Sequence, residues 1–419
     1  MKKVLFIAYH FPPIAGGGTF RSLKFVKYLP ECGWLPTVIT TNTKTSWAYD
    51  NELLKEIPPE VKIIRAPELN LFYLHVILSK IGLGKLYRRF KDRWFIPDDK
   101  IGWLPFAYYQ GRKELKKQHY DLIFSTSPTP CAHLIAMRLK KRFCLPWVAD
   151  YRDHWTLNPE YPFAFQTHRA IRERQTEKQW HSEADQIIVV THGNATDIHT
   201  HFQIDSGKIN LIYNGFDNVT RSNEPFPSVD PLFRLLYSGT FYGNRNPDVI
   251  LRALSLLIQE MPELTNRIKM HFIGKSDYDI QRKSLQYGIS SCVEYLPYLS
   301  RSELTTYYDL CAALLFIIPS DQSHVITSKL FDYLALCKPI LSLIPDGEAK
   351  QILQTSNLGF FADPNSPEDI KNQILHLYHL WQTGRLAVNP NLDFIQQFHR
   401  RQLTESLAYI FNQTLNQRL

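Results

Sequence analysis

The sequence predicts an α/β protein made of two Rossmann-like domains, and three observations lead to this fold class. Short apolar runs alternate with helix-like stretches in both halves of the chain, which is the order of strand, helix and strand in a parallel sheet. The alternation stops at a polar stretch rich in Pro and Ser, 218–231, and then begins again. The length of 419 residues is sufficient for two domains. We therefore expect two parallel sheets that face each other across a cleft.

The domain boundaries follow from this linker. We predict a first domain over 1–217, the linker over 218–231 and a second domain over 232–391, with a final helix over 392–419 that packs back on the first domain. The strands expected in the first domain are 4–8, 37–40, 122–125, 146–149, 184–191 and 209–217. Those expected in the second are 233–238, 268–273, 293–295, 313–318, 340–344 and 359–362.

Composition and charge narrow the class of protein. The chain has 44% hydrophobic and 21% charged residues and a net charge of +8, which suits phosphorylated ligands or an anionic membrane surface. No zinc-finger spacing or RNA-binding aromatic motif is present, so we expect no nucleic acid partner. No signal peptide is recognisable, no apolar run reaches the roughly 20 residues of a membrane span, and the six cysteines form no C-x-x-C pair. We expect a cytoplasmic protein.

A turn with three glycines separates the first predicted strand from the first predicted helix. Gly17 and Gly18 would let the backbone approach a phosphate closely. The dinucleotide pattern G-x-G-x-x-G is not met, because Arg21 stands at its third glycine position. A tight turn does not require three glycines followed by an arginine, so we predict that this loop binds a ligand. The alternative is a tight turn without one.

Charged groups also follow the strand at 146–149. Asp150, Arg152, Asp153 and His154 come directly after it, at the edge of a parallel sheet where ligands collect. The alternative interpretation is a buried Asp–Arg pair that braces the loop.

The stretch 323–341 predicts an anion site in the second domain. A helix begins near Ser328 and ends before Pro339, and the N–H groups at a helix start suit a phosphate. Ser328 is expected to cap this helix. Lys329 adds a positive charge, and Asp332 lies one turn further on.

Residues 69–103 mix apolar and aromatic side chains with cations, a composition typical of a segment in a membrane interface. The alternative is a helical pair packed on the domain, because Gly82 and Gly84 interrupt any single long helix. The residues expected at an acceptor or a membrane are Arg21, Lys85, Arg88, Arg89, Lys91, Arg93 and Trp94.

Several motifs occur in a specific order along nearly the whole chain. They are Phe11-Pro12-Pro13, Gly16-Gly17-Gly18 with Arg21, Gly33-Trp34, Ser125-Thr126-Ser127-Pro128, Pro146 to Asp153, Tyr213 to Asp217, Gly239 to Arg245, and Ser328 to Ala335 with Lys338-Pro339. Together they resemble GT-B glycosyltransferases, and more closely the retaining family-4 type in the branch that builds bacterial surface polysaccharides.

The resemblance implies a donor site in the second domain. In the family, two acids with seven residues between them lie near the donor and the second binds the ribose; here these positions hold His324 and Asp332. A family Arg and a family Lys point toward the diphosphate, and they fall on Thr240 and Arg245. Lys329 or Lys275 is then expected to supply the missing cation.

The resemblance also implies the chemistry. A retaining enzyme of this type lets a donor phosphate accept the acceptor's proton, so no carboxylate base is expected. No metal is implied, because cationic side chains and the helix end stabilise the diphosphate in its place. Asp153 is expected to bind a sugar hydroxyl, with Arg152 as its brace.

The function implied is transfer of a sugar from a nucleotide sugar to a glycan or polyprenyl-linked acceptor, during envelope polysaccharide synthesis at the inner face of the plasma membrane. One alternative is a catalytically degenerate GT-B scaffold that binds a nucleotide or glycan, suggested by His324 and Thr240. Another is an epimerase of the same two-domain shape.

Overall fold

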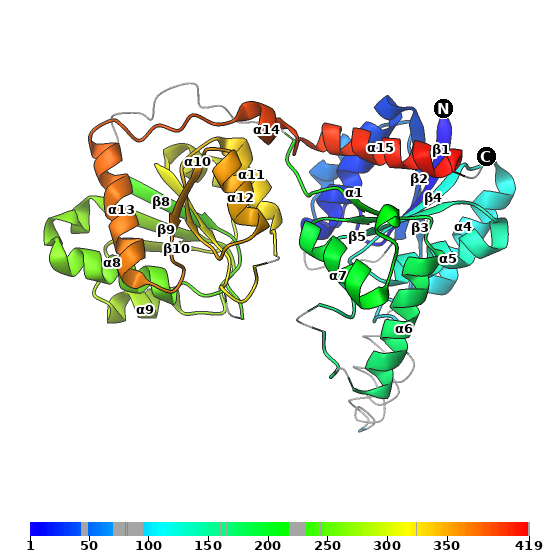
Figure 1. The fold of residues 1–419 in the computed structure, drawn as a ribbon, viewed down its shortest axis with the longest axis horizontal. Coiled ribbons are helices and arrows are strands. Elements are labelled where there is room, and N and C mark those ends of the chain that lie inside the picture. The colour runs from blue at the N-terminus through cyan, green and yellow to red at the C-terminus, as the bar shows by residue number, and fades with distance from the viewer. Residues whose placement is uncertain are drawn as a thin grey trace. The chain divides into compact units, whose positions relative to one another are not determined.

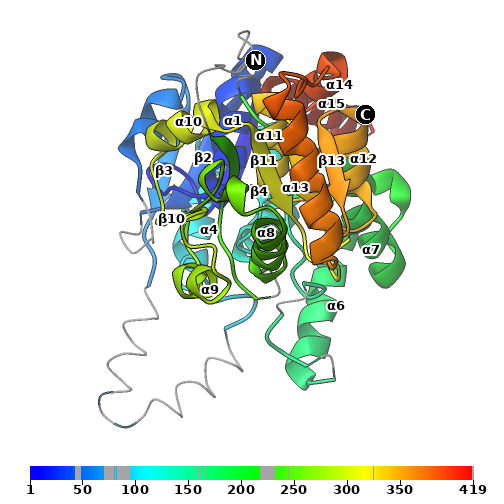
Figure 2. The same cartoon turned by 90° about the vertical axis from the view of Figure 1, so that its left-hand side faces the viewer.

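The structure is a computed structural model that describes residues 1–42, 49–69, 80, 82, 95–158, 161–164, 166–217, 232–243, 245–323 and 325–417. It divides into two compact units. Unit 1 comprises Met1–Asn214 and Arg400–Leu419, and unit 2 comprises Gly215–His399. Each unit contains a parallel sheet with helices packed against it (Figures 1 and 2). The prediction of two α/β domains, each with a parallel sheet, is confirmed.

The described part of unit 1 holds a seven-stranded sheet in the order β3-β2-β1-β4-β5-β6-β7. All neighbouring strands in it run parallel. The strands are β1 Lys2–Ala8, β2 Trp34–Thr41, β3 Lys62–Ala66, β4 Leu122–Thr126, β5 Trp147–Tyr151, β6 Gln186–Val189 and β7 Ile209–Leu211. We predicted each of these except β3, which lies at the sheet edge.

Helices cover both faces of this sheet, because both faces carry apolar side chains. One face packs on α4 Leu104–Lys117, α5 Cys131–Phe143, α6 His168–Glu183 and α7 His192–Phe202. The other packs on α1 Gly17–Tyr28 and α15 Arg400–Asn416. The short 3-10 helices are η1 Leu29–Cys32, η2 Asn51–Glu56 and η3 Ser206–Lys208.

The end of the chain returns to unit 1. The ring of Phe411 lies 5.1 Å from Trp34 and 5.5 Å from Phe124, centroid to centroid. The single helix predicted over 392–419 is wrong in one respect, because the segment forms two helices, α14 Leu392–Gln396 and α15. The break has a physical cause. His399 forms a β-bridge with Phe216, whose N–H donates to Phe398 O at 3.1 Å, and extended backbone of this kind interrupts a helix.

The described part of unit 2 holds a six-stranded parallel sheet in the order β10-β9-β8-β11-β12-β13. Its strands are β8 Phe233–Ser238, β9 Ile268–Ile273, β10 Val293–Leu296, β11 Ala313–Ile317, β12 Ile340–Leu343 and β13 Gly359–Ala362. Its helices are α8 Asp248–Glu260, α9 Ile280–Gln286, α10 Arg301–Leu310, α11 Ser328–Leu336, α12 Glu348–Thr355, α13 Pro367–Gln382 and α14, with the 3-10 helix η4 Pro262–Asn266.

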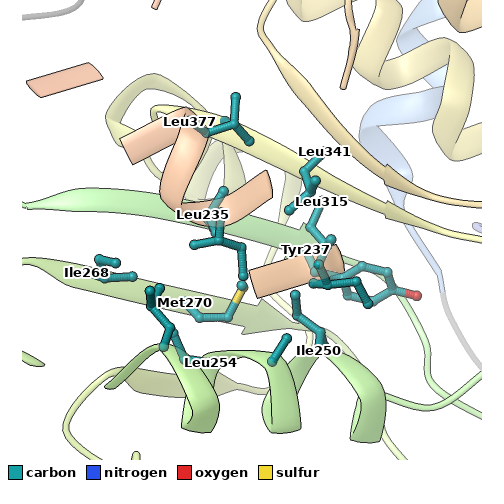
Figure 3. Packing of buried hydrophobic residues seen from close by; sticks show 14 of the residues in the cluster. Leu235, Tyr237, Ile250, Leu254, Ile268, Met270, Leu315, Leu341 and Leu377 are labelled. Atoms are coloured by element: carbon teal, nitrogen blue, oxygen red, sulfur yellow. The ribbon is translucent and has the colours of Figure 1, made fainter. Parts of the chain in front are cut away.

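The core on one face of this sheet is built from alternate residues of the central strands. Leu235 and Tyr237 of β8 pack with Ile250 and Leu254 of α8 and with Leu377 of α13 (Figure 3). The helices α8 and α13 lie side by side over this face (Figure 2). This packing fixes β8, whose end opens into the candidate site.

Candidate functional site

The strand order of unit 2 reverses between β8 and β11, and these two strands separate toward their carboxyl ends. Pairing of β8 with β9 continues to Ser238, whereas its pairing with β11 includes only Leu235 and Leu236. A crevice at such a reversal is where open α/β sheets bind ligands.

Tyrosine side chains occupy the base of this gap. The backbone N–H of Ser238 donates to the phenol oxygen of Tyr333 at 3.0 Å, instead of to a strand. The Ser238 hydroxyl lies 2.7 Å from the Tyr308 hydroxyl. Because Tyr333 is fully buried, this network holds the end of β8 in place just before Gly239.

Two glycines allow close packing at the ends of β8 and β9: Gly239 lies against Lys329, and Gly274 lies against Gly239. Gly239 has φ +146°, and a Cβ there would lie 2.2 Å from Lys329 Nζ. Gly274, which follows β9, has φ +133°, and a Cβ there would lie 2.3 Å from Gly239 O. Only glycine fits both the conformation and the space at these two positions.

Lys329 places its ammonium at the centre of this arrangement. Its Nζ lies 3.7 Å from the ring centroid of Tyr237 and forms no ion pair with any described carboxylate. Burial, followed by the nearby Arg245, lowers the pKa of Lys329 well below its ordinary value, while Asp332 opposes this shift. A bound anion would supply the negative charge that this partly buried cation lacks among the described residues.

Lys329 also lies in the first turn of α11. We predicted Ser328 as the cap of this helix, which is wrong. The cap is Thr327, and Ser328 is the first helical residue. The reason is that Thr327 has extended backbone, φ −79° and ψ 150°, which is the cap conformation. Thr327 Oγ1 is buried without a hydrogen-bond partner in the described structure and does not cap the helix. The N–H groups of the first turn therefore keep no side-chain acceptor.

The other predicted donor residues lie around the same edge or outside the described residues. Arg245 lies 5.6 Å from the ring centroid of Tyr242, and its Nε is buried without a partner among the described residues. Lys275, directly after Gly274, and Asp332, on α11, are exposed. His324 lies outside the described residues.

In unit 1 the glycine loop is held by Arg152. Its Nη2 donates to Gly17 O at 2.5 Å and its Nη1 to Gly18 O at 2.6 Å. We expected Arg152 to brace Asp153, but the guanidinium makes no ion pair with that carboxylate, because the glycine carbonyls take both of its terminal nitrogens. Burial lowers the pKa of Arg152 to about 10, although Asp153 acts in the opposite direction. Asp153 itself is exposed.

Arg21, which we expected near an acceptor or a membrane, is instead part of the core. It is 5% exposed and pairs with the fully buried Asp150 at 2.8 Å. It also donates to the carbonyls of Ile212 and Tyr213 at 2.9 and 2.7 Å. The buried Asp–Arg pair considered as an alternative therefore exists, with Arg21 in place of Arg152 as its cation.

Sequence reasoning missed a second anchor of the loop after β5. Glu177 of α6 is fully buried and accepts the Thr156 N–H at 3.0 Å and the Thr156 hydroxyl at 2.5 Å. Burial alone would raise the pKa of Glu177, but interactions with His181 and Thr156 lower it. The one signal for Glu177 in the sequence is its spacing of four residues from His181, which places the two side chains on the same face of a helix.

The residues expected at an acceptor or a membrane, other than Arg21, cannot be placed. Lys85, Arg88, Arg89, Lys91, Arg93 and Trp94 lie outside the described residues. Over the residues that are described, no helix is long and apolar enough to cross a membrane. Over the same residues, no three His, Cys, Asp or Glu side chains are grouped so that they could hold a metal ion.

Two sequence-family matches cover most of the chain. Residues 15–218 match "Glycosyltransferase Family 4", and residues 220–389 match "Glycosyl transferases group 1". The two matched regions correspond to the two sheets described above.

Curated relatives and solved structures agree with these matches. The chain is 26% identical over 153 residues to a D-inositol 3-phosphate glycosyltransferase of Streptomyces scabiei, a region that covers 33% of this chain and 34% of the relative. The aligned part thus spans about a third of that relative's length.

Two solved structures are similar over the full chain. The Anabaena HepE protein in complex with UDP has a TM-score of 0.66 at 15% identity, and covers 99% of this chain and 100% of its own. The lipopolysaccharide outer core galactosyltransferase WaaB has a TM-score of 0.59 at 16% identity, with 100% of both chains covered. At this identity the similarity shows the fold alone.

Proposed function

The chain belongs to the GT-B glycosyltransferases of the family-4 type, and from this premise we propose that it transfers a sugar from a nucleotide sugar with retention of configuration. The observation that carries the proposal is the partly buried ammonium of Lys329, which has no ion-pair partner among the described residues and lies where the strand order of unit 2 reverses. It lies against Gly239 and at the start of α11, where a diphosphate would meet both a full charge and helix N–H groups.

Within this proposal Lys329 and Arg245 bind the donor diphosphate. The family's first cation position holds Thr240, so Lys329 supplies the charge that is missing there. Lys275 is exposed on the neighbouring loop and adds a second cation as the leaving group departs. Asp332, with Ser328 nearby, accepts hydrogen bonds from the donor ribose, and His324 takes the position of the other family acid.

The transfer step balances without a protein base. The acceptor oxygen forms a bond to the sugar's anomeric carbon on the face that the diphosphate leaves, and the bond from that carbon to the phosphate oxygen breaks. The acceptor's proton goes to a phosphate oxygen. Lys329 and Arg245 stabilise the negative charge that grows on the diphosphate, so no metal is required by this scheme.

In unit 1 the glycine loop and Asp153 take part in substrate binding. Arg152 holds the carbonyls of Gly17 and Gly18 and so fixes the two peptide planes that follow these residues, while Asp153 offers its carboxylate to a sugar hydroxyl. Arg152 is a positioning residue in this proposal.

The acceptor we propose is a glycan or a polyprenyl-linked saccharide of the bacterial envelope. The similar WaaB structure is of a lipopolysaccharide galactosyltransferase, and the similar HepE structure contains UDP, which supports a UDP-sugar donor. Peripheral attachment to an anionic membrane through Lys85, Arg88, Arg89, Lys91, Arg93 and Trp94 is part of this proposal. If neutralising the four residues Arg88, Arg89, Lys91 and Arg93 leaves membrane-fraction binding unchanged, that part is refuted.

A panel of UDP-, GDP- and dTDP-sugars tests the donor assignment. One of them should raise the melting temperature, because a ligand that binds only the folded state stabilises it. Asp332→Ala should abolish turnover of that donor and keep the fold, as judged by circular dichroism. An active Asp332→Ala enzyme would refute the ribose assignment. A wild-type protein that binds a nucleotide sugar but never turns it over would favour the scaffold alternative.

A further inference from the structure

The loop after β5 carries a histidine that the donor chemistry does not use. His154 follows Asp153 and is 11% exposed, and its Nε2 lies 3.1 Å from Asp197 Oδ2 on α7. The pair belongs entirely to unit 1. It joins the loop after β5 to α7, the helix that follows the neighbouring strand β6.

The aspartate decides which ring nitrogen carries the proton. An ionised carboxylate only accepts hydrogen bonds, so Nε2 must be the N–H that donates to Asp197. In the neutral ring Nδ1 then keeps its lone pair. Nδ1 has no hydrogen-bond partner among the described residues. It is also absent from the buried polar atoms that lack a partner, so it is accessible to solvent.

The surroundings keep the ring neutral near pH 7. Burial lowers the pKa of His154, and the charge of Asp197 opposes this shift. The other ionisable groups that face the ring come from α6, where Glu177 raises the pKa and His181 lowers it. A neutral ring with a fixed tautomer presents a hydrogen-bond acceptor.

The position of this acceptor suggests what it binds. Two residues earlier on the same loop, Arg152 holds the glycine loop, and between them Asp153 is exposed. Glu177 anchors the loop again at Thr156, two residues after His154. The nitrogen therefore lies on a loop that is fixed at both ends, at the ligand-binding edge of the sheet.

We propose that His154 Nδ1 accepts a hydrogen bond from a hydroxyl of a sugar acceptor, and that Asp197 is the positioning residue that holds the ring proton on Nε2, so that Nδ1 is the unprotonated nitrogen of the neutral ring. This inference rests on the proposed transferase function and deepens it, since it assigns an acceptor contact. The class of ligand is a sugar hydroxyl, because a neutral nitrogen acceptor matches an O–H donor and does not match a phosphate or a carboxylate.

The test uses the full chain, the nucleotide sugar that the wild type hydrolyses, and four octyl glycosides as acceptor probes, those of glucose, galactose, mannose and N-acetylglucosamine. His154→Phe keeps the ring volume and removes both nitrogens. We expect kcat/KM for the acceptor to fall about three- to tenfold, the size of one hydrogen bond, while donor hydrolysis without acceptor is unchanged. His201→Gln, at an exposed histidine one turn after Asp197 near the carboxyl end of α7, is the matched control and should change neither rate.

Asp197→Asn separates a positioning role from a merely structural one. Transfer requires unprotonated Nδ1, so the rate falls as pH drops through the pKa of His154. Because the Asp197 charge raises that pKa, its removal should move the acid limb of the pH–rate profile to lower pH. A loop that Asp197 only braces would lose activity at every pH without such a shift.

Each outcome decides the inference. Unchanged acceptor kcat/KM in His154→Phe, an equal loss of hydrolysis and transfer, or an unmoved acid limb in Asp197→Asn would overturn it. A wild type that hydrolyses the donor but glycosylates none of the four probes would overturn the sugar-acceptor assignment and leave donor use intact. A wild type with no donor turnover would instead defeat the proposed function.

Discussion

Replacing Lys329 by Met tests the donor site most directly, because the two side chains have similar length and only the charge is removed. Lys329 is partly buried, and its ammonium lies 3.7 Å from the Tyr237 ring centroid without an ion-pair partner among the described residues. The cation–π contact contributes about 2 kcal/mol to folding. Burying an unpaired ammonium costs several kcal/mol. We therefore expect Lys329→Met to be as stable as the wild type or more stable.

Nucleotide binding should respond in the opposite direction. A hydrogen bond from a charged donor to a phosphate contributes about 1.5–3 kcal/mol, which corresponds to a roughly 10- to 150-fold increase in Kd when it is lost. Calorimetric titration with UDP, GDP and dTDP measures this change. Lys269→Met is a suitable control, since that lysine lies on β9 with its ammonium 2.9 Å from Ser291 O and should leave the Kd unchanged.

The pH dependence adds a second readout. The folded-state pKa of Lys329 lies below its unfolded value, so the unfolded chain binds more protons between the two values and wild-type stability rises with pH in that window. Lys329→Met should lack this rise. A variant that melts several degrees lower and binds the nucleotide as tightly as the wild type would refute the assignment of Lys329 to the diphosphate.

Three further changes test the framework of the two units. Gly239→Ala places a Cβ 2.2 Å from Lys329 Nζ at φ +146°, so it should cost about 1–3 kcal/mol in urea unfolding and weaken nucleotide binding, whereas Gly288→Ala, at φ +71° with open space, should affect stability alone. Arg21→Met leaves Asp150 buried without its cation and should cost about 3–5 kcal/mol of unfolding free energy; a loss below about 1 kcal/mol would contradict the buried-pair interpretation. Burial raises the pKa of Asp98 from 3.8 to about 6, so the folded state binds more protons in this window and wild-type stability should fall by about 3 kcal/mol as pH rises from about 4 to about 6; Asp98→Asn should show a flat profile there.

The positions of most strands along the chain could be predicted because buried parallel strands are continuous apolar runs. The strand β3 was not predicted, because Lys62 and Arg65 interrupt its apolar pattern and the strand is only partly buried at the sheet edge. The helix start at 328 was correct, but its cap was assigned one residue late. Ser328 and Thr327 are both good caps, and only the backbone conformation distinguishes them.

The partners of the arginines could not be predicted from the sequence. Asp150 is two residues before Arg152 in the chain. It nevertheless pairs with Arg21, 129 residues earlier, because both side chains are buried between β5 and α1. An ion pair forms between side chains that share a buried space, and sequence distance carries no information about that.

This pairing has a consequence for function. Since Arg21 neutralises Asp150, Arg152 is left without a carboxylate partner and binds the backbone carbonyls of Gly17 and Gly18 instead. Unit 2 contains a comparable arrangement, in which Lys329 lies against Gly239 without a carboxylate. In both units burial lowers the pKa of the cation, so each carries a cost in the empty protein that a bound anion would relieve. Neutralising either cation should therefore reduce the stabilisation that a nucleotide sugar provides more than it reduces the stability of the empty protein.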